Sequence, residues 1–226
     1  MGGGNTIIRI KQGQLWQVGD DLYLCGDHEN QDLNILLDHI TEPIDMIYSD
    51  PPWNAGNCRY WRTIAHRHTG EIETHDVNFN WFWDILRGHI KQIQPRVCWI
   101  EMSVQEHTNV IEYLEGYAPP YAGKWTVCYG SPKRPNILLR FSSEKHISND
   151  PTGLSGESVT EWAFNQSDSL QSQNVLDFCI GLGMTSRFAY KFDKTCYGME
   201  LNPTRLEKTI EWISKKTGLK PELLKE

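Results

Sequence analysis

The string Asp50-Pro51-Pro52-Trp53 follows an apolar run, residues 44–49, that has the composition of a buried strand. Two prolines cannot continue a hydrogen-bonded ladder, so the strand ends there. The chain then presents the Asp50 carboxylate and a backbone carbonyl outward, and Trp53 adds an aromatic face. Two acceptors beside a stacking ring are what recognition of an amino-bearing base requires. The alternative is a surface turn in which Trp53 anchors to the core.

A second segment combines a strand with glycines. Residues 175–179 are apolar apart from Asp177, and Gly181-Leu182-Gly183 leads directly into a helical pattern. Such a loop lets the backbone approach a ligand closely and directs helix N–H groups at it. A plain turn between strand and helix is an alternative. A dinucleotide-binding fold is another, although the third glycine of its motif falls at Ser186.

About 20 residues further on, Glu200 ends the next strand-like run. An acidic residue there can accept hydrogen bonds from both hydroxyls of a ribose. The alternative is an acid in the first turn of the following helix, where the macrodipole favours negative charge. Together with the glycine loop, Glu200 indicates a nucleoside-containing ligand.

The elements that position these residues alternate along the chain. Two short β-like runs around Gly19-Asp20-Asp21 indicate a hairpin, and 125–129 and 137–141 are close enough to pair antiparallel. Single helices between strands predict a mainly parallel sheet covered on both faces. The other expected strands are 44–49, 96–102, 175–179 and 195–199; the expected helices are 30–40, 79–94, 104–114, 158–164, 185–191 and 203–216; and 54–78 and 142–156 are expected loops.

Composition limits the class of protein. The 226 residues carry 22 Lys and Arg against 29 Asp and Glu, a net charge of −7, which argues against binding nucleic acid through the whole surface. One globular domain is expected at this length. No apolar stretch is long enough to span a membrane and no basic leader begins the chain, so we expect a cytosolic or nuclear protein. The six scattered cysteines indicate buried thiols and no metal site.

Three segments, in their order along the chain, resemble motifs of the DNA amino-methyltransferases, which methylate N6 of adenine or N4 of cytosine with S-adenosyl-L-methionine. They are Leu15-Trp16-Gln17-Val18-Gly19 leading to Gly26-Asp27, the string Asp50-Pro51-Pro52-Trp53, and the loop from Asp177 to Thr185. A catalytic motif ahead of the cofactor loop is similar to the β-type permutation of these enzymes. The resemblance implies a single-domain, Rossmann-like α/β fold: a mainly parallel seven-stranded sheet with one antiparallel hairpin and helices on both faces.

The resemblance also implies roles for individual residues. Asp50 and the Pro51 carbonyl would bind the target amine beside the methyl group, and Trp53 would stack on the extruded base. Orientation would then supply most of the rate, with no covalent enzyme intermediate. The implied contacts to S-adenosyl-L-methionine are Asp177, Phe178, Gly181, Gly183, Met184 and Thr185 around its methionine end, Glu200 and Asn202 near its ribose, Asp27 at its adenosine side, and Asp50.

Target recognition has little room in this chain. The expected catalytic half covers about 15–142 and the cofactor-loop half about 157–216, and the segment between them is too short for a separate recognition domain. DNA selection is therefore expected from loops, or from a second copy or partner subunit. The candidate DNA contacts are Arg59, Tyr60, Trp61, Arg62 and Arg67 after the catalytic motif, with Lys133 and Arg134 in a later turn. The alternative for the first group is a solvated loop with one tucked aromatic.

The first and last residues of Asp50-Pro51-Pro52-Trp53 favour adenine, because the cytosine enzymes of this family more often begin the motif with serine. The resemblance thus implies an N6-adenine DNA methyltransferase of the restriction–modification type, in the cytoplasm of a bacterial, archaeal or phage-infected cell. The alternatives are an RNA adenine-N6 enzyme, a DNA cytosine-N4 enzyme, a non-catalytic subunit of the same fold, and, last, a nicotinamide-dependent oxidoreductase.

Overall fold

The computed structural model describes residues 9–67, 79–130, 133–144, 147–168 and 171–226. Short strands alternate with helices through most of these ranges. The strands are β1 (Leu15–Val18), β2 (Asp21–Cys25), β3 (Met46–Ser49), β4 (Val97–Ser103), β5 (Tyr121–Tyr129), β6 (Arg134–Ser142), β7 (Asn174–Asp177), β8 (Thr195–Glu200) and β9 (Glu222–Lys225). The helices are the 3-10 helix η1 (His28–Asn30), α1 (Leu33–Leu37), α2 (Ala55–Arg67), α3 (Phe79–Ile93), α4 (His107–Leu114), α5 (Glu157–Asp168), α6 (Met184–Lys191) and α7 (Pro203–Thr217).

All nine strands of the described ranges form one mixed sheet, in the order β5-β6-β4-β3-β7-β8-β2-β1-β9. The five strands from β4 to β2 in this order run parallel, as the alternation of strands and helices predicts. Antiparallel strands flank them on both sides, β6 and β5 at one edge and β1 and β9 at the other.

The expectation of seven strands with one antiparallel hairpin is wrong. The sheet contains the hairpin of β5 and β6 and also the hairpin of β1 and β2, and β9 extends it further by pairing with β1. All four residues of β9 are exposed, so the strand has no alternation of apolar and polar positions that a sequence could reveal. Its backbone hydrogen bonds to β1 are what define it.

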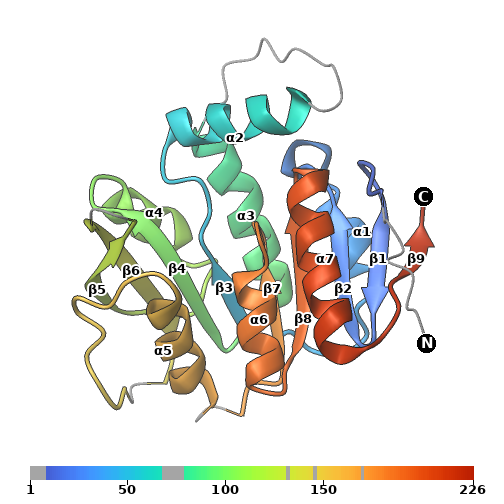
Figure 1. Cartoon of the computed structure of the whole chain (residues 1–226). Coiled ribbons are helices and arrows are strands. Elements are labelled where there is room, and N and C mark those ends of the chain that lie inside the picture. The colour runs from blue at the N-terminus through green and yellow to red at the C-terminus, as the bar shows by residue number, and fades with distance from the viewer. Residues whose placement is uncertain (1–8, 68–78, 131–132, 145–146, 169–170) are drawn as a thin grey trace.

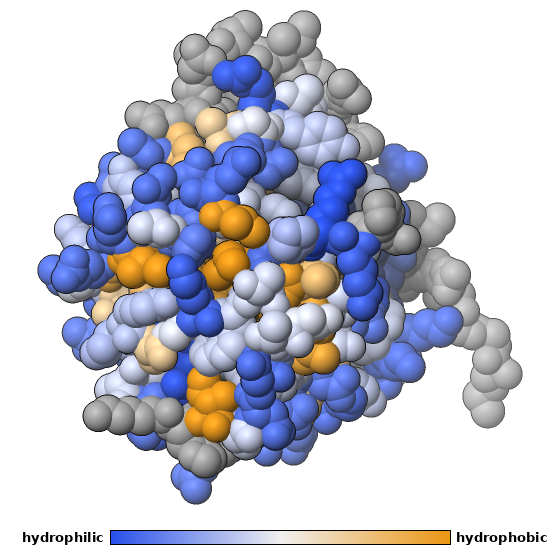
Figure 2. All heavy atoms as spheres, turned by 90° about the vertical axis from the view of Figure 1, so that its left-hand side faces the viewer, coloured by the Kyte–Doolittle hydropathy of each residue, from blue (hydrophilic) through white to orange (hydrophobic). Residues whose placement is uncertain are grey.

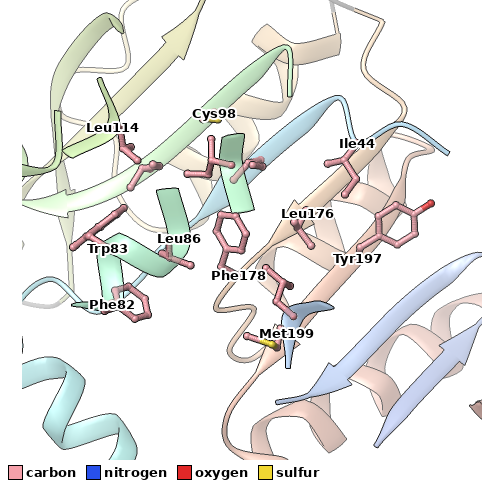
Figure 3. Packing of buried hydrophobic residues seen from close by; sticks show 14 of the residues in the cluster. Ile44, Phe82, Trp83, Leu86, Cys98, Leu114, Leu176, Phe178, Tyr197 and Met199 are labelled. Carbon is pink, nitrogen blue, oxygen red and sulfur yellow. The ribbon is translucent and has the colours of Figure 1, made fainter. Parts of the chain in front are cut away.

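Helices cover both faces of the sheet, as expected (Figure 1). Helices α1, α3 and α4 build one hydrophobic layer with the sheet, and α5, α6 and α7 build the other. Figure 3 shows part of the first layer, in which Trp83 and Leu86 of α3 and Leu114 of α4 belong to the same cluster as Leu176 and Met199 of the central strands. No helix in the described ranges is long and apolar enough to cross a membrane.

The outer face beside β5 and α4 has a different character. Figure 2 shows that hydrophilic residues cover most of this face and that the hydrophobic ones lie in small, separate groups. The residues of the two hydrophobic layers are buried, on either side of the sheet. Six cysteines contribute to the interior or lie partly buried, and all carry free thiols.

The prediction of a loop over residues 54–78 is wrong for its first part, because residues 55–67 form helix α2. Residues 68–78 lie outside the described ranges. The helix begins after Asn54, whose side-chain Oδ1 accepts a hydrogen bond from the backbone N–H of Asn57 at 2.9 Å.

The buried face of α2 explains why its periodicity is hidden in the sequence. Cys58, Arg62 and Ala65 are buried at helical spacing. An arginine in the middle of such a face is normally taken as exposed, so the pattern looks like a polar loop. The helix becomes evident only when the partner of Arg62 is known.

The helix expected over residues 30–40 is shorter than predicted. The chain makes the 3-10 turn η1, and Gln31 then adopts a left-handed conformation with φ of 57°, which a continuous α-helix cannot contain. Helix α1 begins at Leu33. The backbone N–H of Asp27 donates to Asp32 Oδ2 at 2.8 Å and holds this turn against the end of β2.

Candidate active site

A cavity of about 780 Å³ lies at the carboxyl ends of the parallel strands, a size typical of small-molecule sites. Each of these five strands contributes one acidic residue to the cavity, in its last residues or just beyond its end. They are Asp27 after β2, Asp50 after β3, Glu101 in β4, Asp177 in β7 and Glu200 in β8. Helix α2 lies across this end of the sheet (Figure 1) and lines the cavity as well.

Asp50 is held by the tryptophan of its own motif. The indole Nε1–H of Trp53 donates to Asp50 Oδ1 at 2.7 Å. The Trp53 ring in turn meets Tyr129 edge to face, with centroids 4.9 Å apart. This arrangement fixes one carboxylate oxygen of Asp50, while the side chain remains exposed to the cavity.

Asp50 and Glu101 form a pair of neighbouring carboxylates. Ser49 lies opposite Ile100 in the ladder of β3 and β4, so the residues that follow them are neighbours at the end of the sheet. The protein wall around Asp50 removes water and, together with the charge of Glu101, raises the pKa of Asp50 well above its usual value. Water in the open cavity limits this effect, and a ligand that displaces the water would strengthen it.

Glu101 is anchored from below the cavity. Tyr48 donates its hydroxyl to Glu101 Oε1 at 2.5 Å, and Asn136 Nδ2 donates to Glu101 Oε2 at 2.9 Å. Burial raises the pKa of Glu101 also, and these two hydrogen bonds act in the opposite direction. The sequence motifs did not indicate Glu101, although a charged residue inside the buried run of β4 was an available signal.

Asp177 connects the two motifs. Its carboxylate accepts hydrogen bonds from Ser49 Oγ at 2.9 Å, from the Cys179 N–H at 2.9 Å and from Thr185 Oγ1 at 2.5 Å. The residue is only 3% exposed, and burial raises its pKa to about 6 despite these hydrogen bonds. Asp177 therefore holds the end of β3, the glycine loop and the start of α6 in one arrangement.

The glycines of the loop are required by the backbone. Gly181 and Gly183 have φ of 59° and 77°, which side chains with a Cβ rarely adopt. A Cβ on Gly181 would lie 2.5 Å from Arg205 Nη2, and one on Gly183 would lie 2.6 Å from Thr209 Cγ2. The close approach at both positions is to helix α7. Gly181 lines the cavity, and Gly183 lies behind it as the first residue before α6.

Glu200 faces an arginine of α7. Arg205 Nε lies 3.8 Å from Glu200 Oε2, and the Arg205 guanidinium lies 4.3 Å from the ring centroid of Trp61 in α2. Burial raises the pKa of Glu200, and Arg205 opposes that shift. Asn202 has a different place, because its buried side chain caps α7 by accepting from the Thr204 N–H at 3.0 Å.

Asp27 has an arginine partner of its own. Arg62 of α2 donates two hydrogen bonds to its carboxylate, and both residues are buried. His28, next to it, shares a 3.0 Å hydrogen bond with the Phe178 carbonyl through Nε2. Burial lowers the pKa of His28 to about 4, so this ring is neutral at physiological pH and donates to that carbonyl.

The sequence matches no protein-family model and no curated protein. Solved structures do match. M1.HpyAVI in complex with SAM is 12% identical, with a TM-score of 0.55 over 83% of this chain and 95% of that one. TTHA0409 of Thermus thermophilus, in complex with S-adenosyl-L-methionine, is also 12% identical, with a TM-score of 0.54 over 86% of this chain and 93% of that one. The cytosine-N4-specific PvuII DNA methyltransferase is 12% identical as well, with a TM-score of 0.57 over 86% of each chain.

The chain has the fold of the DNA amino-methyltransferases. In this methyltransferase fold, the residues singled out from the sequence are brought largely together. The whole string Asp50-Pro51-Pro52-Trp53 lines the cavity. The other predicted residues that line it are Asp27, Tyr60, Trp61, Arg62, Arg134, Asp177, Phe178, Gly181, Met184, Thr185 and Glu200.

Five predicted residues are placed elsewhere or are not described. Gly183 and Asn202 pack behind the cavity wall, and Arg59 and Lys133 are exposed outside it. Arg67 ends α2, and its side chain lies outside the described part.

The methyltransferase fold also brings residues to the cavity that the sequence analysis did not select. His28 directly follows Asp27, and Arg205 lies in the first turn of the helix after Glu200, so proximity to the motifs was a signal for both. Tyr129 ends β5 and lies opposite Arg134, the first residue of β6, so it is close to the predicted Lys133 and Arg134. Tyr48 and Arg187 carry no comparable pattern, because their place in the cavity depends on the fold.

Proposed function

We propose that this chain is an S-adenosyl-L-methionine-dependent DNA methyltransferase that methylates the exocyclic N6 amine of adenine. The observation that carries the proposal is a single cavity that contains both Asp50, with Trp53, and the glycine loop with Glu200. The likeness to methyltransferases whose structures include S-adenosyl-L-methionine supports the choice of cofactor.

The residues of the cavity fit this cofactor. The absence of a Cβ at Gly181 opens the wall where the loop meets α7, and Glu200 offers a carboxylate for the ribose hydroxyls. Phe178 and Met184 supply apolar surface, and Asp27 a second carboxylate. When bound, the cofactor supplies an activated methyl group. Asp177 would position the glycine loop without binding the cofactor through its carboxylate, because that carboxylate already accepts hydrogen bonds from three donors of the chain.

Asp50 would orient the target amine. Trp53 holds one of its carboxylate oxygens, and the side chain is open to the cavity, so the carboxylate can accept a hydrogen bond from an exocyclic N–H. Methyl transfer would exchange the bond between the methyl carbon and the cofactor sulfur for a bond to the nitrogen, which would then have one proton to lose. Asp50 would receive that proton, and the neighbouring Glu101 favours the protonated form by raising the pKa of Asp50.

Adenine is favoured by the aspartate at the start of the motif. Cytosine N4 is the second candidate, because the cytosine-N4-specific PvuII enzyme has the same fold with a TM-score of 0.57. Both bases offer an exocyclic amine, so the chemistry assigned to Asp50 serves either one. The base therefore has to be identified from the reaction product.

The decisive experiment incubates the protein with labelled S-adenosyl-L-methionine and unmethylated DNA of mixed sequence, and then identifies the modified nucleoside by mass spectrometry. We expect N6-methyladenine. N4-methylcytosine would transfer the proposal to the second base, and better transfer to a matched RNA would replace DNA as the substrate. Cofactor binding without transfer to either nucleic acid would identify a non-catalytic subunit.

Substitution of Asp50 tests the assignment of the site. Asp50→Ala should lower turnover by at least about 100-fold, a typical contribution of one acid–base group. Cofactor affinity, measured by calorimetry, should change little. Asp20→Ala, which removes an exposed aspartate outside the cavity, is the matched control and should have normal turnover. Equal loss of turnover and of cofactor affinity in Asp50→Ala would assign Asp50 to the cofactor instead.

A further inference from the structure

The mouth of the cavity collects exposed apolar side chains. Tyr60, Trp61, Tyr129 and Leu182 are 56%, 39%, 50% and 48% exposed, and all four line the cavity. We call the three residues with rings, Tyr60, Trp61 and Tyr129, the aromatic rim. Large apolar groups that remain exposed together around an opening indicate a surface for a ligand.

The aromatic rim comes from separate segments of the chain. Tyr60 and Trp61 lie side by side on α2, with ring centroids 5.1 Å apart. Tyr129 ends β5 and meets Trp53 of the catalytic motif. Directly across the ladder from Tyr129 is Arg134, an exposed cation. Rings are thus available on more than one side of the place where a target base would enter.

Of the four arginines that line the cavity in the described ranges, three are paired within the chain, and Arg134 is the exposed one. Arg62 pairs with Asp27, Arg187 with Glu157 at 3.3 Å, and Arg205 with Glu200 and the face of Trp61. Duplex DNA presents about one negative charge per 1.7 Å of its axis, and binding it requires many cations that face outward. The five carboxylates of the cavity and the net charge of −7 act against such binding.

We infer that the enzyme takes its DNA as a single strand, with bases next to the target stacked on the aromatic rim. This inference rests on the proposed function and names the form of its substrate. Stacking on aromatic rings accepts any base, because every base has a π-face, so exposed rings can contribute to holding a strand where few cations face outward. A single strand also presents the target amine without the cost of opening base pairs.

The test compares methyl transfer to a circular single-stranded phage DNA with transfer to its duplex form, which contains the same sequence. We expect kcat/KM to be at least about 10-fold higher for the single strand. Binding to it should weaken only slightly with salt, as for fewer than about three phosphate contacts. Equal or better transfer to the duplex, or to an RNA of the same sequence, would overturn the inference. No transfer to any of these nucleic acids would instead contradict the proposed function itself.

Variants of the aromatic rim separate stacking from folding. Tyr60→Ala should raise the KM for the single strand by roughly 5- to 150-fold, the loss expected from one stacked base, with a small change in kcat. Tyr60→Phe keeps the ring and should restore the KM. The matched control is Tyr190→Ala, because Tyr190 is 47% exposed, also meets a tryptophan edge to face, and lies outside the cavity. An unchanged KM in Tyr60→Ala, or an equal change in Tyr190→Ala, would show that the aromatic rim does not bind the strand.

Discussion

Arg62 and Asp27 form a two-pronged ion pair inside the molecule. The guanidinium Nη1 and Nη2 donate to the two carboxylate oxygens, each at 2.9 Å, and the side chains are 10% and 8% exposed. Planar groups paired in this way are among the stronger hydrogen-bonded ion pairs in proteins. The pair joins α2 to the residue after β2, so it fastens the helix across the cavity.

The first prediction concerns this ion pair. Arg62→Ala should lower the free energy of unfolding by about 3–5 kcal/mol, because the substitution removes the two charged hydrogen bonds that Arg62 donates to the buried Asp27 carboxylate. Urea titrations measure the loss. Arg59→Ala, one turn earlier on the same helix and exposed, is the control and should change stability by less than about 1 kcal/mol.

A double substitution tests whether the loss of stability comes from breaking the buried ion pair. Arg62→Leu combined with Asp27→Leu removes both charges, so it should cost less stability than Arg62→Leu alone. A double variant that is no more stable than the single one would show that the loss reflects the packing of α2.

The second prediction is a shift in the pH dependence of methyl transfer. Under the proposed function, Asp50 accepts a hydrogen bond from the target amine as an ionised carboxylate, so kcat/KM should fall as the pH falls through the pKa of Asp50. Burial, Glu101 and Asp177 raise that pKa, while Trp53 and Arg205 lower it. Glu101→Gln removes one of the raising charges. The fall of kcat/KM at acidic pH should therefore begin at a lower pH in Glu101→Gln. In that acidic range the variant should have a higher kcat/KM than the native protein.

Rates across a pH series measure this shift. The control is Glu115→Gln, an exposed position outside the cavity, which should keep the native profile. An acidic limb that stays in place in Glu101→Gln would mean that Asp50 does not set it.

The third prediction concerns stability and pH. Burial raises the folded pKa of Asp177 to about 6 from an ordinary value of 3.8. The folded state therefore holds more protons than the unfolded state between these values, and the contribution of Asp177 to stability falls as the pH rises through 6. Asp177→Asn cannot titrate. Its stability relative to the native protein should improve by about 1–3 kcal/mol between pH 4 and pH 7.

Urea titrations at several pH values measure both the direction and the size of this change in the relative stability of Asp177→Asn. Asp150→Asn is the comparison, because hydrogen bonds from Thr152 lower the pKa of this exposed carboxyl. The stability of Asp150→Asn relative to the native protein should therefore fall as the pH rises, which is the opposite direction. A similar trend in both variants would mean that Asp177 is not the source.

The fourth prediction separates backbone conformation from contact in the glycine loop. Gly183 and Gly153 both have positive φ, 77° and 83°, but a Cβ would meet Thr209 only at Gly183. Both alanine substitutions bear the cost of the left-handed conformation. Gly183→Ala should cost about 1–3 kcal/mol more in stability than Gly153→Ala, because α7 must move. Equal losses would indicate that the loop relaxes without disturbing α7.

Much of the candidate site could be predicted because its residues end strands. Asp50, Asp177 and Glu200 each lie where an apolar run stops, and parallel strands bring such ends to one edge of the sheet. Glu101 was missed because β4 continues to Ser103, so the glutamate lies within the strand and no turn marks it.

The parts of the fold that could not be predicted depend on contacts distant in sequence. Helix α2 looks polar because the buried position of Arg62 makes sense only with Asp27, which is 35 residues away. Strand β9 has no pattern of its own and exists through its pairing with β1. Local sequence patterns were sufficient to predict the parallel strands at the centre of the sheet, because each of these strands has an apolar run.

The order of the strands has a consequence for how the protein is made. Strands β7 and β8, from the last quarter of the chain, lie between β3 and β2, which come from the first. A nascent chain that has emerged only as far as β6 therefore leaves one long side of β3 and of β2 without a partner. The cavity residues of β7, β8 and the glycine loop can join those that follow β2 and β3 only after Glu200 has left the ribosome, so a chain interrupted before β8 has exposed edges and no complete site.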